Sequence, residues 1–183
     1  MVDLALTRPA TLADGRLVCL DGPAGSGKTT LAAEVAALVP GAQVVHMDDL
    51  YAGWSGIDHA VTDQLDSILL PLAEGLAGSY RRFDWASDRF AETHVVQPGP
   101  LLVVEGVGSG TIAHAALRTV LVWVTAPREL RVSRGVERGG EGIRDHWQLW
   151  EVSEQVVFDR EDTEARADVR VDGTGADHPQ VIT

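Results

Sequence analysis

Short apolar runs alternate along the chain with longer stretches in which apolar residues recur every three or four positions. The runs that have the length of buried strands lie at residues 17–20, 43–46, 101–104, 120–124 and 167–171. Short continuous apolar runs are typical of strands buried on both faces, and such strands alternate with helices in parallel sheets. The pattern therefore predicts an α/β fold with a parallel sheet.

The stretches between those runs have helical periodicity. Residues 58–76 place apolar side chains on one face at spacings of three and four, and Pro71 is expected to disturb the second half. Pro127 is typical of a first helical residue, and a cluster of glycines ends the helix that it begins. A further helix is expected over residues 143–160, with Trp147, Trp150 and Val157 buried. Residues 81–100 show no clear periodicity, so we interpret them as a functional loop.

One motif carries a specific chemistry. Directly after the first apolar run, the sequence GPAGSGKT matches the P-loop pattern GxxxxGK[ST] in the strand-loop-helix context that the motif requires. Its glycines let the backbone wrap an anion with N–H groups pointing inward, and the following helix adds a positive dipole end. Lys28 is expected to bridge the terminal phosphates and Thr29 to bind Mg²⁺. The predicted nucleotide-binding residues are Gly22, Pro23, Ala24, Gly25, Ser26, Gly27, Lys28, Thr29 and Thr30.

The number of lysines bears on which nucleotide the chain binds. Lys28 is the only lysine in the chain, whereas the guanine-reading motif NKxD of GTP-binding switch proteins needs another. A dinucleotide-binding alternative rests on the glycines from Gly106 to Gly110, but GxGxxG requires a glycine where Thr111 stands. ATP with Mg²⁺ is therefore the expected cofactor pair, and the sequence leaves open whether GTP can replace ATP.

Carboxylates follow two of the predicted strands. Phosphoryl transfer to an alcohol needs a carboxylate near the hydroxyl and acidic support for the metal. Asp48 and Asp49 follow the second apolar run, at the sheet edge where α/β proteins bind ligands, and Glu105 ends the third run. We therefore predict Asp48 and Glu105 as metal ligands beside Thr29, and Asp49 and Glu105 as acceptor contacts. Turn or cap duty is the alternative for the aspartate pair.

The stretch without periodicity offers candidate contacts to the acceptor. Trp85 is predicted to stack on or wall a ring of the acceptor, with simple packing as the alternative. Asp84 and Arg89 are predicted to bind polar groups of the acceptor, with a salt-bridged loop as the alternative.

Several phrases of the sequence recur together in one family. They are, in order, DGPAGSGKTTLA, HMDDLY, RFDWASDRF, LLVVEG and RVSRGVERGGEGIRD. Through them, residues 16–172 resemble the uridine kinase-like family of P-loop kinases. The resemblance implies a three-layer α/β/α P-loop NTPase fold with a five-stranded parallel sheet in the order 2-3-1-4-5. It also implies a small lid, at about residues 134–146, that closes over the phosphates.

The resemblance further implies roles for single residues. Asp48 matches the catalytic base toward the acceptor hydroxyl, and Tyr51 matches an aromatic residue that lines the acceptor pocket. Glu105 matches the acidic residue near the metal and the acceptor. Asp58 lies near an acidic position that helps to hold a sugar.

The lid and the acceptor segment depart from the family pattern in places. Arg138 and Arg144 match lid arginines that neutralise the transferring phosphoryl group, but Gly135 stands where family members often have another arginine. Arg131, Arg134 and Arg138 are spaced to share one helix face, and a solvated face that pairs with Glu129 and Glu137 is the alternative for all three. Phe83 and Asp88 replace a tyrosine and a histidine that the family uses around the nucleobase of the acceptor. The resemblance therefore does not fix uridine as the acceptor.

Composition excludes some other classes. The net charge of −12 repels a phosphate backbone, and no basic run exceeds Arg81-Arg82, so nucleic acid is not expected as a partner. The lone Cys19 cannot form an internal disulfide. No signal peptide and no apolar run of about 20 residues is present, so we expect no membrane contact and a cytoplasmic location. Residues 1–183 are expected to form a single kinase domain.

The sequence therefore predicts an ATP-dependent kinase that phosphorylates a hydroxyl of a small molecule, most simply a nucleoside or similar compound. A sugar acid, a vitamin precursor or a nucleoside monophosphate is an alternative acceptor. An ATP-sensing module without catalysis is the alternative from another class. The sequence does not decide between a monomer and a homodimer.

Overall fold

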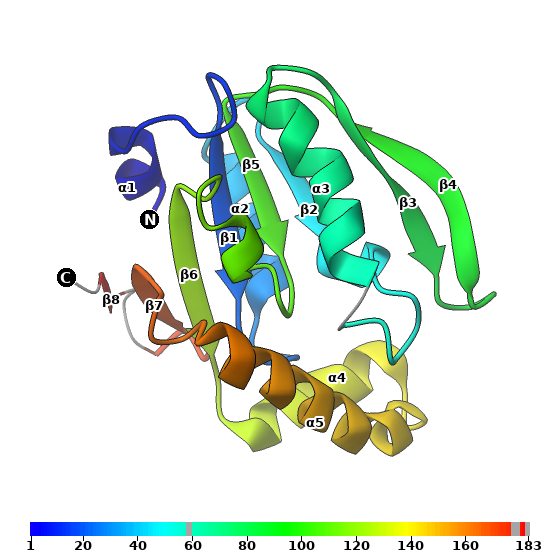
Figure 1. The fold of residues 1–183 in the computed structure, drawn as a ribbon. Helices are drawn as coiled ribbons and strands as arrows, with labels where there is room; N and C mark the ends of the chain where they lie inside the picture. Colours follow the sequence, from blue (N-terminus) through cyan, green and yellow to red (C-terminus); the bar gives the residue numbers. More distant parts are fainter. Residues whose placement is uncertain (58–59, 177–179, 182–183) are drawn as a thin grey trace.

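The predicted strands form the parallel part of one central sheet. The computed structural model describes residues 1–57, 60–176 and 180–181. The parallel strands are β1 (Arg16–Asp21), β2 (Gln43–His46), β5 (Leu101–Glu105), β6 (Val120–Thr125) and β7 (Val169–Asp172). They lie in the order β2-β5-β1-β6-β7, which confirms the predicted order, and a short antiparallel strand β8 (Gln180–Val181) extends the sheet to six strands (Figure 1).

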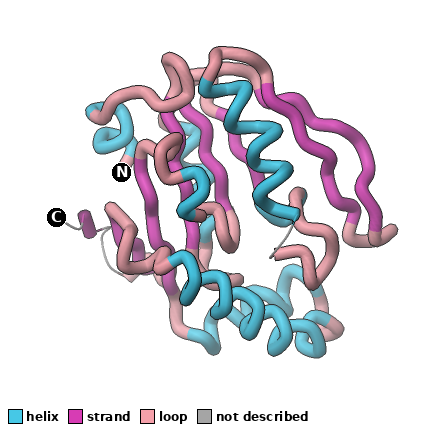
Figure 2. Tube along the Cα trace, in the orientation of Figure 1, coloured by secondary structure: helices cyan, strands magenta, loops and turns pink. Residues whose placement is uncertain are grey.

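Helices cover both faces of this sheet, as expected for a three-layer α/β/α fold. They are α1 (Val2–Thr7), α2 (Lys28–Ala37), α3 (Ala60–Ala73), α4 (Arg128–Gly139) and α5 (Ile143–Glu161). Strand β1 shows why the layers form, because successive side chains point to opposite faces. Val18 and Leu20 pack with α1 and α2, whereas Leu17 and Cys19 pack in the cluster that contains residues of α3 and α5. Figure 2 shows the strands between these helical layers.

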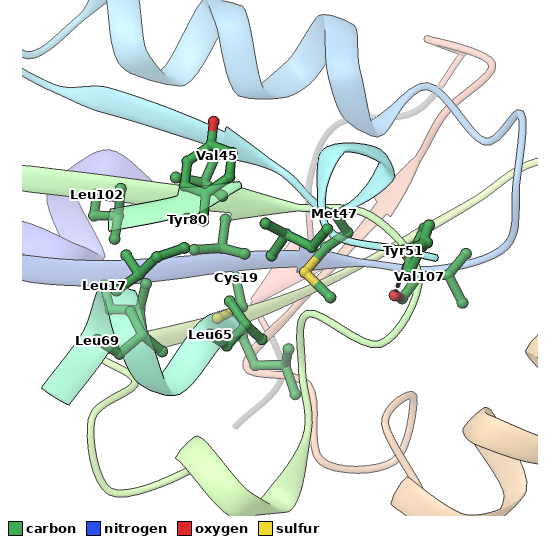
Figure 3. Packing of buried hydrophobic residues seen from close by; sticks show 14 of the residues in the cluster. Leu17, Cys19, Val45, Met47, Tyr51, Leu65, Leu69, Tyr80, Leu102 and Val107 are labelled. Carbon is green, nitrogen blue, oxygen red and sulfur yellow. Dashed lines mark hydrogen bonds between the residues drawn. The ribbon is translucent and has the colours of Figure 1, made fainter. Parts of the chain in front are cut away.

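The larger core cluster lies between the sheet and α3. Leu65 and Leu69 of this helix are almost completely buried against sheet residues such as Leu17 and Leu102 (Figure 3). Cys19 belongs to the same cluster, and burial raises the pKa of its thiol to about 12. The helix contains Pro71 and ends two residues after it, so it is shorter than the predicted stretch 58–76.

The segment 81–100 is not a loop, contrary to the prediction. It contains most of a hairpin of β3 (Gly78–Asp84) and β4 (Arg89–Val96), which packs beside α3 (Figure 1). The pairing register shifts between Arg81 and Phe83, so the two-residue alternation of buried and exposed side chains is interrupted. Most of β4 is exposed or half-buried. Both features remove the periodicity that would have indicated strands.

The remaining elements are short helical turns, η1 (Met47–Asp49) after β2 and η2 (Ile112–His114) after β5. Helices α4 and α5 cross the end of the sheet at which β1 and β5 terminate (Figure 1). The predicted lid at residues 134–146 corresponds to the end of α4, the following turn and the start of α5. Within the described ranges, no helix combines the length and the apolar character needed to cross a membrane.

A buried carboxylate organises the loops at this end of the sheet. Asp21, at the end of β1, accepts N–H hydrogen bonds from Gly22 (2.7 Å), Gly108 (3.0 Å) and Gly110 (2.8 Å). A Cβ atom at Gly110 would lie 3.0 Å from the Asp21 carboxylate and 2.7 Å from the side chain of Leu121. Gly110 therefore serves this close packing, and a Cβ atom at Gly106 would lie 2.5 Å from the side chain of Met47, so both glycines have structural reasons that involve no dinucleotide.

We predict that Asp21→Ala lowers the free energy of unfolding by about 3 kcal/mol or more, because three buried N–H groups lose their acceptor. Urea denaturation followed by circular dichroism measures the change. Glu34→Ala, on the exposed face of α2, is the control and should shift stability by less than about 0.5 kcal/mol. An Asp21→Ala effect no larger than that of the control would contradict the anchoring role.

Candidate active site

The P-loop has a backbone shape that only glycine adopts easily. Gly22, Gly25 and Gly27 have φ angles of 136°, 76° and 103°. At Gly22 a Cβ atom would lie 2.1 Å from the carbonyl oxygen of Val124, and at Gly25 one would lie 2.4 Å from that of Arg131. Helix α2 begins at the next residue, Lys28, so its free N–H groups face the loop.

Lys28 is held in place by the loop itself. Its ammonium donates to the carbonyl oxygens of Gly22 (2.6 Å) and Pro23 (2.9 Å), and the residue is 7% exposed. An ammonium has three N–H donors, so these two bonds leave one for a phosphate oxygen. Burial lowers the pKa of Lys28, against the opposing charges of Glu105 and Asp21. A bound polyphosphate would favour the charged form further.

Two of the three candidate metal ligands, Thr29 and Glu105, meet beside this lysine, and the third, Asp48, lines the same cavity. The hydroxyl of Thr29 donates to Glu105 Oε1 at 3.0 Å, and Nδ1 of His46 lies 2.6 Å from the same oxygen. Among the described residues, no group of three or more His, Cys, Asp or Glu side chains could hold a metal ion alone. A hydroxyl and a carboxylate fit Mg²⁺, which takes few protein ligands and completes its shell with water and phosphate oxygens.

The proposed base lies in the same cavity. Asp48 as a whole residue is exposed to the cavity, yet the surrounding walls desolvate its carboxyl group enough to raise its pKa, and the charge of Glu105 adds to this shift. The positive charges of Arg138 and Lys28 act in the opposite direction. A raised pKa makes the Asp48 carboxylate a stronger proton acceptor than an ordinary aspartate.

The cavity has a volume of about 990 Å³ and brings together most of the predicted groups from distant parts of the chain. Predicted site residues in its lining are Ala24, Gly25, Gly27, Lys28, Thr29, Thr30, Asp48, Trp85, Glu105 and Arg138. The other predicted nucleotide-binding residues, Gly22, Pro23 and Ser26, lie behind this surface. Two of them supply the carbonyls that hold Lys28, and Ser26 is fully buried.

An aromatic wall faces the phosphate-binding side. Trp54, Trp85, Trp147 and Trp150 all line the cavity. Trp54 stacks on His146 with ring centroids 4.8 Å apart and meets Trp85 edge-on at 5.1 Å. The indole N–H of Trp85 donates to the backbone oxygen of Asp48 at 2.9 Å, so the wall is tied to the proposed base.

Only Trp85 of this wall was predicted as a site residue. Trp147 and Trp150 were expected to be buried in their helix, and they are, at 5% and 6% exposure, although their edges reach the cavity. Tryptophan makes up 5 of the chain's aromatic residues, beside 2 tyrosines and 3 phenylalanines. Beyond Trp85 itself, this enrichment in tryptophan is the feature of the sequence that points to such a wall.

Some predicted acceptor contacts lie elsewhere. Tyr51 is fully buried and donates to the backbone oxygen of Val107 at 2.5 Å, so it packs behind the cavity instead of lining it (Figure 3). Asp49 turns toward the hairpin, where its carboxylate is 3.5 Å from the hydroxyl of Tyr80. Asp58 lies outside the described residues.

The two charged residues of the hairpin also have local roles. Asp84 accepts from the backbone N–H of Ala86 (3.2 Å) and from the hydroxyl of Ser87 (2.5 Å), which closes the turn between β3 and β4. Arg89 is the cross-strand partner of Asp84 and is exposed at the start of β4. Neither residue is in the described lining of the cavity, so their contact with the acceptor stays a prediction.

Of the two predicted lid arginines, Arg138 lines the cavity and Arg144 does not. Arg144 pairs with Glu141 at 2.6 Å on the exposed surface, outside the cavity. Arg134, which was not predicted, lines the cavity and donates to the carbonyl oxygens of Gly25 (3.3 Å) and Gly173 (2.9 Å). A periodic arginine face on α4 was visible in the sequence, but not which arginine would reach the P-loop.

The glycine in the lid also has a structural reason. A Cβ atom at Gly135 would lie 2.2 Å from the indole ring of Trp147. A longer side chain there would displace this tryptophan from the cavity wall. The glycine at position 135, where family members often have an arginine, therefore makes room for Trp147 of α5.

Comparison with known proteins agrees with this architecture. A family model described as an AAA domain matches residues 18–165. A "possible uridine kinase" from Bacillus stearothermophilus has 20% sequence identity and a TM-score of 0.63, over 86% of this chain and 89% of that chain. A "putative fructose transport system kinase" from Silicibacter sp. TM1040 has 22% identity and a TM-score of 0.66, over 93% and 96%. A search of curated proteins finds no match to the sequence.

The contact between His46 and Glu105 predicts a pH dependence. The hydrogen bond with Glu105 raises the pKa of His46 above its ordinary value of 6.5. Burial pushes the pKa of Glu105 upward, but the hydrogen bond with His46 and the charge of Lys28 outweigh it, so the pKa falls below 4.5. The contribution of Glu105 to folding stability is complete above pH 4.5 and is lost as the pH falls through its lowered pKa. The contribution of His46 is complete below pH 6.5 and is lost as the pH rises through its raised pKa.

NMR titration of the imidazole should therefore give a His46 midpoint above 6.5 that falls in the Glu105→Gln variant. The reason is that the amide removes the negative charge that stabilises the imidazolium. A midpoint at or below 6.5, or one that the substitution leaves unchanged, would show that the pair does not form in solution.

Proposed function

The chain belongs to the AAA domain family of P-loop proteins, and from this premise we propose that it is an ATP-dependent kinase acting on a hydroxyl of a small molecule. The observation that carries the proposal is a single cavity that joins the P-loop to a carboxylate base. Lys28, Thr29, Asp48, Glu105 and Arg138 all face it. This is the set of groups that phosphoryl transfer to an alcohol requires.

Each group has a defined task in the proposed reaction. The loop amides and the ammonium of Lys28 bind the phosphates of ATP, and Arg138 supplies a further positive charge to the moving phosphoryl group. Mg²⁺, held through Thr29 and Glu105, would neutralise charge on the phosphates. Asp48 accepts the proton of the acceptor hydroxyl as the new P–O bond forms and the bond to ADP breaks.

The acceptor side of the cavity favours an uncharged compound with a ring. Trp54 and Trp85 are partly exposed there, at 40% and 36%, and tryptophan faces bind flat rings and the apolar faces of sugars. A nucleoside or a related sugar compound fits this wall. The acceptor is therefore proposed to be held mainly by aromatic contacts beside Asp48.

A phosphorylated or acidic acceptor is less well supported. Such a compound needs cations beyond those that serve ATP. Arg82 pairs with Glu92 at 2.6 Å, and Arg81 donates to the backbone oxygen of Phe90 at 3.0 Å, so both are engaged within the hairpin. This favours an uncharged alcohol over a nucleoside monophosphate or a sugar acid.

The proposal is tested by measuring ADP release with MgATP across a panel of nucleosides and sugars. We expect acceptor-dependent turnover that falls by about a hundredfold or more in Asp48→Asn, because the amide cannot take the proton. Calorimetry should show MgATP affinity within about threefold of the unsubstituted protein. The adjacent Asp49→Asn, which removes a carboxylate that faces the hairpin, is the matched control and should retain activity.

An ATP-sensing module would give a different result. It would bind MgATP without acceptor-dependent ADP release, and Asp48→Asn would then change nothing. Near-normal turnover in Asp48→Asn on a productive acceptor would instead remove Asp48 from the role of base.

A further inference from the structure

A buried ion pair binds both the backbone N–H and the backbone carbonyl of one P-loop residue. Glu154 of α5 accepts a hydrogen bond from the backbone N–H of Ala24 at 2.8 Å. Arg131 of α4 donates to the carbonyl oxygen of the same residue at 3.3 Å. The two side chains also meet each other at 3.5 Å, with side-chain exposures of only 12% and 5%. Both lid helices are therefore joined to the third residue of the loop.

The pair contacts the loop on the side away from the cavity. Ala24 lines the cavity, whereas Arg131 and Glu154 are absent from its described lining. The backbone of α4 also packs directly on the loop, because a Cβ atom at Gly25 would lie 2.4 Å from the carbonyl oxygen of Arg131. A ligand in the cavity can thus touch Ala24 without displacing the pair. The contact is compatible with a bound nucleotide.

A buried carboxylate at this point is costly unless its partners compensate. Burial raises the pKa of Glu154, and the N–H of Ala24 with the charges of Lys28 and Arg131 opposes that rise. Removing one partner of such a pair leaves an uncompensated buried charge. The carboxylate therefore has little freedom to move, and a fixed acceptor fixes the N–H that it binds.

We propose that Arg131 and Glu154 are positioning residues for nucleotide binding, which act through Ala24 and couple α4 and α5 to the P-loop. The pair orients the peptide groups on both sides of Ala24, and the second of these carries the N–H of Gly25, the first of the amides from Gly25 to Lys28 that would cradle an anion. Because coupling is reciprocal, a nucleotide that orders the loop also orders the two lid helices. The inference rests on the proposed function only in requiring that the chain binds MgATP.

The test is the dissociation constant of MgATP, measured by calorimetry well below the unfolding midpoint of each variant. We expect Glu154→Ala to weaken binding by about tenfold, because the Ala24 N–H loses a charged acceptor. Glu154→Gln keeps an oxygen acceptor and should recover most of that loss. Arg131→Met should also weaken binding, and the double variant should lose less than the product of the two single effects.

Glu151→Gln is the matched control. Glu151 lies one turn earlier on α5 and pairs with Arg128 at 2.7 Å and Arg131 at 3.7 Å, with no hydrogen bond to the loop. Its substitution should leave the MgATP dissociation constant within about twofold. Should Glu154→Ala fail to fold, the weaker MgATP binding expected of Arg131→Met still decides the matter.

The outcomes are separable. Tight MgATP binding by the unsubstituted protein together with unchanged affinity in the folded single variants would overturn the positioning role and leave the proposed function intact. A lower unfolding midpoint with unchanged affinity would do the same, because it would show a purely structural pair. Absence of MgATP binding by the unsubstituted protein would overturn both proposals.

Discussion

The ammonium of Lys28 is fixed inside the loop that it serves. Two carbonyl groups, those of Gly22 and Pro23, hold it, and the left-handed glycines of the loop allow these carbonyls to turn toward it. A charged group in so buried a position needs polar partners from every side. The loop supplies some of them, and a polyphosphate can supply the rest. The remainder of the site is arranged around this cation.

The sheet and the lid helices meet this requirement from opposite directions. Strand β1 ends at Asp21, whose carboxylate accepts a hydrogen bond from the N–H of Gly22, the first residue of the loop. Strand β5 ends at Glu105, whose carboxylate accepts a hydrogen bond from the hydroxyl of Thr29. From the other side, Arg131 and Glu154 hydrogen-bond the backbone of Ala24, the third residue of the loop. An acidic chain therefore arranges a site suited to an anion from a few fixed backbone N–H groups and one ammonium, to which α4 adds Arg134 and Arg138.

Local patterns predicted the parts of this site that depend on neighbours in sequence. The apolar runs specified the buried strands, and GPAGSGKT specified the P-loop, because both signals lie within a few residues. The hairpin was missed because the register shift near Phe83 interrupts its alternation. Tyr51 was assigned to the acceptor pocket, but its ring packs in the core, a position that only the tertiary packing decides. Glu154 lies 130 residues from Ala24, and no local pattern marks such a pair.

The most direct measurement is MgATP binding by the Lys28→Ala variant, compared with the unsubstituted protein by calorimetry. In the proposed complex the ammonium places a positive charge against the phosphates, so its removal should weaken binding by about a hundredfold while the far-ultraviolet circular dichroism stays unchanged. Equal affinity in the two proteins would contradict the central claim that this loop and its lysine bind the nucleotide.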